Sequence, residues 1–235
     1  MSAGAPAGRG ADEASTPGAR RLLGLFDGVL RGIPPEPDGL TEVAGSPGPP
    51  ADAVFAFTGH FVVGADVDGD EIARRCPPGD FSVPLSPAFL LWLGGELGSR
   101  PVTHDVVFGA VCGGGEPPVG LSPLRLDHPH GRVARAVRFR RDVSAYSTSG
   151  GEGVLVLGRG VAGRWELAFE VEPHARGCGL GRELVGCALR MLPEGTPVYA
   201  QVATGNTSSM RAVIAAVLVP VCAEVLFPLA GRPVP

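Results

Sequence analysis

The sequence predicts a mixed α/β fold with a mostly antiparallel central sheet and flanking helices. Three strand-like runs, at 142–148, 153–159 and 164–171, are separated by short glycine-containing gaps, as in an antiparallel meander. Helical and strand-like apolar patterns then alternate to the end of the chain. With 235 residues, 44% of them hydrophobic, the chain is large enough to bury a core.

The first part of the chain is irregular in composition. Residues 1–18 are mostly small or turn-forming, so we expect a disordered tail. An N-terminal α/β segment at 19–104 follows. Its expected elements are a helix at 20–32, a Pro/Gly-rich linker at 34–50, a strand-like stretch at 53–67, a helix near 70–75 and a helix at 87–98 that Ser86 caps.

The second part, 105–230, has a regular element order. Its expected elements are a strand at 105–112, a helix within 128–141, the three-strand meander, a helix at 180–192, a strand at 198–204, a helix at 207–217 and final strands near 219–229. This order of elements describes one mixed α/β domain.

Charge and cysteine content exclude several classes of protein. The net charge is −4, so no overall positive field attracts nucleic acid or an anionic membrane. Five cysteines form no C-x-x-C pair, which argues against a disulfide framework and against structural zinc, and favours a reducing cytoplasm. The longest apolar run, at 212–223, is too short to span a bilayer, and the N-terminus has no signal-peptide pattern.

One glycine cluster points to a ligand. RGCGLG, at 176–181, lies between the strand-like run that ends at Val171 and an amphipathic helix. The first turn of a helix has unpaired N–H groups and a partial positive charge, so a diphosphate can bind there through the backbone. A P-loop is excluded because the chain has no lysine, and G-x-G-x-x-G fails because Arg182 replaces the third glycine.

These residues resemble the GNAT superfamily of acyl-CoA-dependent N-acyltransferases. The stretch VEPHARGCGLGREL fits its Q/R-x-x-G-x-G/A loop after a strand that ends V-x-P, and NTSSMRA from Asn206 resembles its second CoA-contacting helix. The element order of 105–230 also fits. The resemblance implies a GNAT-like fold, with the N-terminal segment serving as a lid over the acceptor site or as a degenerate second half.

The resemblance also implies the ligand and its contacts. Acetyl-CoA would lie between two splayed strands, with no metal required, and an amine would be the acceptor. The expected contacts are the backbone of Phe169, Glu170 and Val171, the loop residues Arg176, Gly177, Cys178, Gly179, Leu180, Gly181 and Arg182, and Asn206.

The catalytic groups are less well defined by sequence. Glu166 and Glu170 lie on one face of an alternating strand and are the candidates for the base; solvated surface carboxylates are the alternative. Gln201 stands where some relatives have a carboxylate, and Val213 where they have a general-acid tyrosine. Tyr199 is expected in the core, so the acid is unassigned.

Histidine and cysteine patterns suggest two further sites, each with a simpler alternative. His128 and His130 beside Asp127 would suit a metal if a third ligand joined them, but a polar helix start explains them as well. Cys178 would suit a covalent acyl-cysteine only if its side chain faced the thioester.

The sequence therefore predicts a cytoplasmic N-acetyltransferase that acts on an amine, most simply of a small molecule, by direct attack. The alternatives are a catalytically weak acyl-CoA-binding module for regulation or assembly, and a fold kept for structure alone. Acceptor identity and oligomeric state, monomer or homodimer, stay open.

Overall fold

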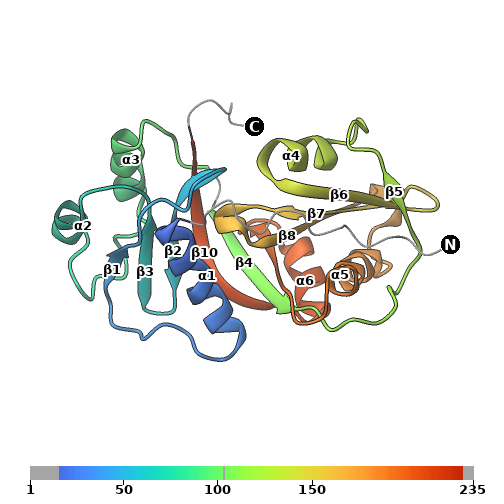
Figure 1. Ribbon diagram of the computed structural model, residues 1–235, viewed down its shortest axis with the longest axis horizontal. Coiled ribbons are helices and arrows are strands. Elements are labelled where there is room, and N and C mark those ends of the chain that lie inside the picture. Colours follow the sequence, from blue (N-terminus) through green and yellow to red (C-terminus); the bar gives the residue numbers. More distant parts are fainter. Residues whose placement is uncertain (1–15, 103, 230–235) are drawn as a thin grey trace.

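A single ten-stranded sheet runs through the molecule (Figure 1). The structure is a computed structural model that describes residues 16–102 and 104–229. In spatial order the strands are β1 (Thr41–Val43), β3 (His60–Gly64), β2 (Ala51–Phe57), β10 (Val219–Pro228), β4 (His104–Val111), β9 (Pro197–Ala203), β8 (Trp165–Val171), β7 (Gly153–Arg159), β6 (Arg141–Thr148) and β5 (Leu121–Leu124). All neighbours pair antiparallel except β1 with β3 and β8 with β9, which confirms the predicted, mostly antiparallel sheet.

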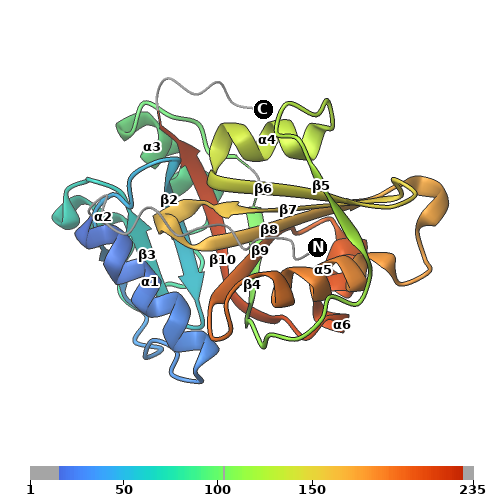
Figure 2. The ribbon, with the colours of Figure 1, turned by 45° about the vertical axis from the view of Figure 1, so that its right-hand side comes forward.

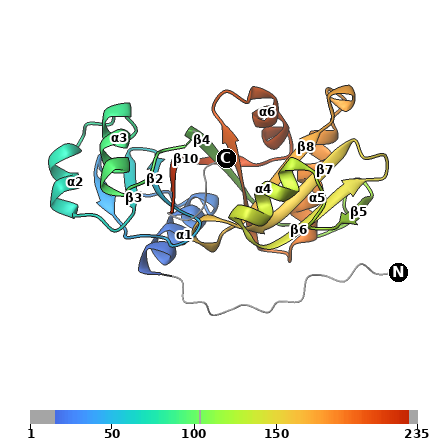
Figure 3. The same cartoon turned by 90° about the horizontal axis from the view of Figure 1, so that it is seen from above.

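Helices cover both faces of this sheet. The helices are α1 (Pro17–Leu30), α2 (Gly69–Arg75), α3 (Pro87–Glu96), α4 (Gly131–Phe139), α5 (Leu180–Met191) and α6 (Thr207–Ala215), with short 3₁₀ helices η1 (Val161–Gly163) and η2 (Pro173–Ala175). We name the face covered by α1, η1 and α4 the α4 face, and the face covered by the other α-helices the α5 face. Figure 2 shows α4 and α5 on opposite sides of the meander, and Figure 3 shows α1 and α6 on opposite sides of the sheet.

The meander confirms the predicted period-2 pattern. In β7, Val154 and Val156 pack under α4, whereas Leu155 and Leu157 join the core under α5 and α6. Side chains of one strand alternate between faces, so a strand covered by helices on both sides must be apolar throughout. The meander therefore lies between α4 on one face and α5 and α6 on the other.

The N-terminal segment belongs to the same sheet. β2 pairs with β10 from Ala51↔Pro228 to Ala56↔Ala223, and β10 pairs on its other side with β4. The final strands expected near 219–229 are one strand with a register shift between Pro220 and Cys222. The boundary at 104 and the role of the segment as lid or second half stay predictions.

Several local expectations can be compared with the structure. Ser86 caps α3, with its Oγ accepting from Phe89 N at 3.2 Å, as predicted. α1 starts at Pro17, capped by Thr16, and so takes in the end of the expected tail; the tail's residues 1–15 lie outside the described part. β1 and β5 were not predicted, because each is at most four residues long and lies in a Pro/Gly-rich stretch. In the described part of the chain, no helix is long and apolar enough to cross a membrane.

Candidate active site

β8 and β9 separate partway along their length. They pair in parallel from Trp165↔Val198 to Leu167↔Ala200, and the pairing stops there, although β8 stays paired with β7 up to Val171. The edge of β8 from residue 168 to 171 that faces β9 is therefore without a strand partner. Strand edges of this kind can bond an extended ligand through main-chain groups.

A cavity of about 440 Å³ occupies this separation. Glu166, Ala168 and Gln201 line it from the α4 face. Leu167 and Val202, whose side chains point to the α5 face, also border it. Its remaining lining residues are Pro50, Ala51, Val102, Asp105, Arg132, Arg135, Ala136, Phe139, Arg140, Val161, Phe169, Ala200, Ala203, Asn206, Ser209, Leu226 and Pro228. Because strand residues of both parities border it, the cavity passes through the sheet, from α6 on one face to α4 on the other.

The glycine cluster forms the turn between β8 and α5. Gly177 has a φ of +84° and Gly179, the residue before the helix, a φ of +92°. Both values lie in the left-handed region that residues with a Cβ avoid. The first helical bond, from Glu183 N to Gly179 O, is 3.2 Å long, so the N–H groups that precede it in the first turn have no acceptor within the helix.

α5 differs from the other α-helices in how it begins. Side chains of Thr16, Asp68, Ser86, His130 and Asn206 cap the other five described α-helices, whereas no side chain caps α5, because Gly179 holds that position. An uncapped, exposed helix N-terminus attracts an anion through its N–H groups and its partial positive charge.

Packing and a hydrogen bond fix the loop on the sheet. A Cβ at Gly181 would lie 3.2 Å from Phe169 Cε2 and 3.4 Å from Ala212 Cβ, so glycine lets α5 approach β8 and α6 closely. Arg176 Nε donates to Val171 O at 2.9 Å and ties the loop to the end of β8. These contacts hold the start of α5 next to the unpaired edge of β8.

The other predicted loop residues are placed as follows. Leu180 is partly buried against the α5 core, and Arg182 and Cys178 are exposed. Asn206 lines the cavity and caps α6, its Oδ1 accepting from Ser209 N at 3.1 Å. Of the expected cofactor residues, Phe169 and Asn206 line the cavity, and Gly181 packs against Phe169; the remaining loop residues are not part of its lining, and their role stays a prediction.

The two candidate bases lie on the α4 face but differ in their surroundings. Glu170 is 42% exposed and accepts from Arg132 Nε at 3.0 Å. Glu166 is buried, and its carboxylate accepts from Arg140 Nε at 3.0 Å and Arg164 Nε at 2.9 Å, and more weakly from Val161 N at 3.3 Å. Three donors occupy most of the acceptor positions of the Glu166 carboxylate.

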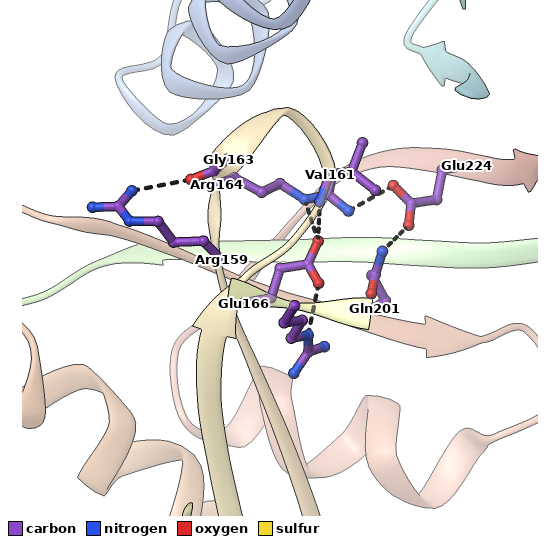
Figure 4. A network of polar contacts seen from close by, with 8 residues as sticks. Arg159, Val161, Gly163, Arg164, Glu166, Gln201 and Glu224 are labelled. Atoms are coloured by element: carbon purple, nitrogen blue, oxygen red, sulfur yellow. Dashed lines mark hydrogen bonds and ion pairs between the residues drawn. The ribbon is translucent and has the colours of Figure 1, made fainter. Parts of the chain in front are cut away.

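Glu166 belongs to a network of buried polar groups (Figure 4). Arg164, fully buried, also donates from Nη2 to Glu224 Oε2 at 2.8 Å, and Gln201 Nε2 donates to Glu224 Oε1. The Arg164 guanidinium lies 4.8 Å from the centroid of the Phe26 ring of α1. Burial raises the pKa of the Glu224 carboxyl, an effect that Arg164 opposes. The network links Gln201 and Arg140, two residues of the cavity wall.

No tyrosine reaches the cavity. Tyr199 is buried, as predicted, and its hydroxyl donates to Asp27 Oδ1 at 2.9 Å; burial, with Asp27 nearby, raises its pKa. Val213 is fully buried in the α5 core, so that position carries no acid. Gln201 lines the cavity, as its alignment with the carboxylate position implied.

The histidine pair forms a helix start. His130 caps α4, with Nδ1 accepting from Arg132 N at 3.1 Å, and His128 Nδ1 accepts from His130 N at 3.2 Å. Asp127 is paired with Arg125. Among the described residues no three His, Cys, Asp or Glu side chains gather closely enough to hold a metal.

Comparison with solved structures gives several partial likenesses. A GNAT-family protein from Novosphingobium aromaticivorans is 17% identical over 55% of this chain and 66% of its own, with a TM-score of 0.40. A GNAT-family acetyltransferase from Colwellia psychrerythraea is 11% identical, over 67% and 69% of the two chains, with a TM-score of 0.37. A GCN5-related N-acetyltransferase from Kribbella flavida is 14% identical, over 62% and 65%, also with a TM-score of 0.37.

The chain thus spans about two thirds of the length of these three proteins, and at these identities and TM-scores the likenesses establish neither a family nor an activity for it. No protein-family model and no curated protein sequence matches the chain. The mixed α/β fold with a mostly antiparallel sheet, expected from the sequence, is confirmed by the chain's own topology. The meander, the loop before α5 and the separation of β8 from β9 all have the predicted order.

Sequence reasoning missed Arg140 of the cavity wall and the buried network behind it. Arg140, Arg164 and Glu224 received no role, although all three are buried or nearly so and bonded to one another or to Glu166. The local arginine density of α4 was visible in the sequence and could have pointed to Arg135 and Arg140. Glu224 gave no such signal, because its partners lie on other strands.

Proposed function

We propose that the chain is an acyl-CoA-dependent N-acyltransferase that transfers an acetyl group from acetyl-CoA to the amine of a small molecule by direct attack. The observation that carries the proposal is the cavity of about 440 Å³ that passes between the separated ends of β8 and β9, beside the uncapped start of α5. A long, thin thioester with a diphosphate requires a groove with free main-chain groups and an anion site at one end.

Specific residues would hold the donor. The first-turn N–H groups of α5, at 179–182, would donate to the diphosphate, and the exposed Arg182 adds positive charge nearby. Main-chain groups of Phe169, Glu170 and Val171 would form hydrogen bonds with the extended pantetheine arm of acetyl-CoA, in place of a strand partner. Cys178 contributes its peptide group rather than its thiol, because its side chain is exposed.

The reaction needs few side chains beyond those that position the reactants. A neutral amine attacks the thioester carbonyl, so an N–C bond forms, the C–S bond breaks, the nitrogen loses a proton and the sulfur gains one from solvent. Glu166 lines the cavity but its carboxylate already has three donors, whereas Glu170, outside the lining, is half-exposed and bonded to one arginine; we propose Glu170 as the group that takes the proton, through water. Glu166 instead holds Arg140 and Arg164 in place.

Isothermal titration of acetyl-CoA into wild type and Gly179→Asp tests the proposal. An aspartate beside the diphosphate position should weaken binding by about 100-fold through charge repulsion and loss of the glycine conformation. Gly195→Asp is the matched control, since Gly195 also has a positive φ, +82°, and open space around its Cβ, but lies in the turn after α5. Absence of binding to wild type, or an equal loss in both variants, would contradict the proposal.

A second candidate is a catalytically weak acyl-CoA-binding module. It is favoured by the absence of an acid, because Val213 is buried in the core and Tyr199 is bonded to Asp27. An amine panel with CoA release as the readout separates the two candidates. Turnover that Glu170→Gln reduces while acetyl-CoA affinity persists supports the enzyme; tight binding with no amine-dependent release supports the module.

A further inference from the structure

The α4 side of the cavity is rich in guanidinium groups. Arg132, Arg135 and Arg140 border it, against two carboxylates, Asp105 and Glu166. This local charge is opposite in sign to the net charge of −4 of the whole chain. The overall charge therefore does not describe what this wall attracts.

The arginines of α4 reach the cavity because of helix periodicity. Arg132, Arg135, Ala136 and Phe139 all line it, and their spacing of i, i+3, i+4 and i+7 places them on one side of the helix. α4 contains no acidic residue, so the charge of Arg135 is not compensated within the helix, whereas Arg132 is paired with Glu170 of β8. An anion in the cavity would give Arg135 a favourable partner.

Arg140 has an unused donor at the same wall. Its side chain is only 11% exposed, and Nε is bonded to Glu166, yet Nη1 is buried without a hydrogen-bond partner among the described residues. A buried N–H group without an acceptor is unfavourable, so a small shift of the Arg140 side chain that brings Nη1 to a ligand oxygen in the cavity would be favoured. Glu166 does not neutralise Arg140 alone, since it also accepts from Arg164.

Arg135 supplies a second, more accessible guanidinium. It is exposed, lines the cavity, and lies 5.5 Å from the centroid of the Phe139 ring, which limits its freedom. A planar guanidinium matches a carboxylate through two parallel N–H···O bonds.

We propose that the acceptor carries a carboxylate in addition to its amine, as an amino acid does, and that Arg135 and Arg140 bind this carboxylate on the α4 side of the cavity. The inference rests on the acyltransfer function proposed above and names its substrate class. Polyamines and aminoglycosides, which bring only positive charge to an arginine-lined wall, are disfavoured by the same argument.

Matched pairs of acceptors test this assignment. Phenylalanine is compared with 2-phenylethylamine, leucine with 3-methylbutylamine, and O-phosphoethanolamine with ethanolamine, at equal concentrations of neutral amine and with CoA release measured. We expect kcat/KM to favour each amino acid by at least about tenfold, the gain of one charge-assisted pair. An equal or greater rate with the amines that lack an acidic group overturns the inference. A preference for O-phosphoethanolamine without a preference for the amino acids would overturn the carboxylate assignment and indicate a phosphate site instead.

Variants locate the effect. Arg135→Gln, at an exposed position that folding does not require, should raise KM for amino acids about tenfold and leave 2-phenylethylamine unchanged. Arg140→Lys, which keeps a positive charge beside Glu166 but loses the guanidinium, should likewise raise KM for amino acids and not for 2-phenylethylamine. Arg190→Gln, at an exposed arginine of α5 outside the cavity lining, is the control. Equal changes for both members of a pair would contradict binding of the carboxylate by these arginines.

Equilibrium binding separates this inference from the function on which it depends. Titration of phenylalanine and of 2-phenylethylamine into the protein, with and without acetyl-CoA, needs no turnover. Binding of acetyl-CoA without selective binding of the amino acid would overturn the inference alone. Selective amino-acid binding that Arg135→Gln abolishes, in a protein that does not bind acetyl-CoA, would overturn the acyltransfer function and leave the carboxylate site.

Discussion

The two sides of the β8–β9 separation use polar groups in opposite ways. On the α5 face, the groups available to a ligand are backbone N–H groups, held by Gly177 and Gly179 in left-handed conformations. On the α4 face, they are side chains, and Arg140, Glu166 and Arg164 are buried and bonded to one another. Backbone conformation thus defines the first surface, and side-chain identity and pairing define the second.

This difference predicts how the two sides respond to substitution. Where the backbone carries the function, most side chains can change but glycine cannot gain a Cβ without strain. Where buried charges carry it, removal of one partner leaves the others desolvated and unpaired. The largest effects on stability should therefore come from the α4 face.

Arg164→Met should have the largest effect. Glu166 and Glu224 would stay buried without the guanidinium that bonds both, which costs about 3–5 kcal/mol of unfolding free energy. Urea denaturation measures it, with Arg159→Met, 41% exposed and stacked on Trp165, as the control at below about 1 kcal/mol. The double variant Arg164→Met/Glu224→Gln should lose less than the sum of the two single variants. A loss below about 1 kcal/mol for Arg164→Met would show that the network is not a stabilising unit.

Gly177→Ala should have an intermediate effect, confined to the loop. Its Cβ would meet no atom within 4 Å, so the cost is the backbone strain alone, about 1–2 kcal/mol, and acetyl-CoA binding should weaken roughly tenfold. Cys178→Ser, next to it, should change the affinity by less than about twofold, because the thiol is exposed. Titration of acetyl-CoA measures both. A large loss of acetyl-CoA affinity in Cys178→Ser with none in Gly177→Ala would contradict the prediction that the backbone, and not the side chains, of this loop binds the ligand.

Val217→Gly should have the smallest effect, and in the opposite direction. Val217 has a φ of +67° directly after α6, and Leu218 N donates back to Val213 O at 3.1 Å, a helix ending that normally takes glycine. Relief of the backbone strain stabilises the folded state, and the extra conformational entropy of glycine in the unfolded chain offsets part of this gain. The net stabilisation should be about 0.5–1 kcal/mol. Thermal unfolding measures it, and acetyl-CoA affinity should not change. A lower melting temperature would mean that the exposed valine side chain makes a contact that outweighs its strain.

Which features of the structure the sequence predicts depends on how far apart in the chain the interacting residues lie. The meander, the cap at Ser86 and the loop at 176–181 depend on residues close in the chain, and all three form as predicted. Local patterns of period 2 and 3.6 and turn glycines suffice for such elements.

The candidate site was predictable from the sequence only around the glycine loop. The glycine loop and Asn206 form a local signature. Arg164 and Glu224, in contrast, are 60 positions apart and meet only because β10 lies between β2 and β4 in the sheet. Of the two arginines bonded to the Glu166 carboxylate, Arg164 is only two positions away in the sequence, whereas Arg140 is 26 positions away and no local pattern pairs it with Glu166. Arginine density in α4 was a usable signal, and only the structure shows which of those arginines face the cavity.

The shared strand β10 affects the order of events during synthesis. β2 and β3 leave the ribosome early and can pair with each other. The second partner of β2 is β10, which pairs from Ala51↔Pro228 to Ala56↔Ala223 and is made only after the other nine strands. Until then the nascent chain displays an apolar strand with an open edge, a surface that invites pairing with other chains. Closing so long a loop is slow, so we expect chaperone dependence and refolding yield to be limited by the docking of residues 219–228.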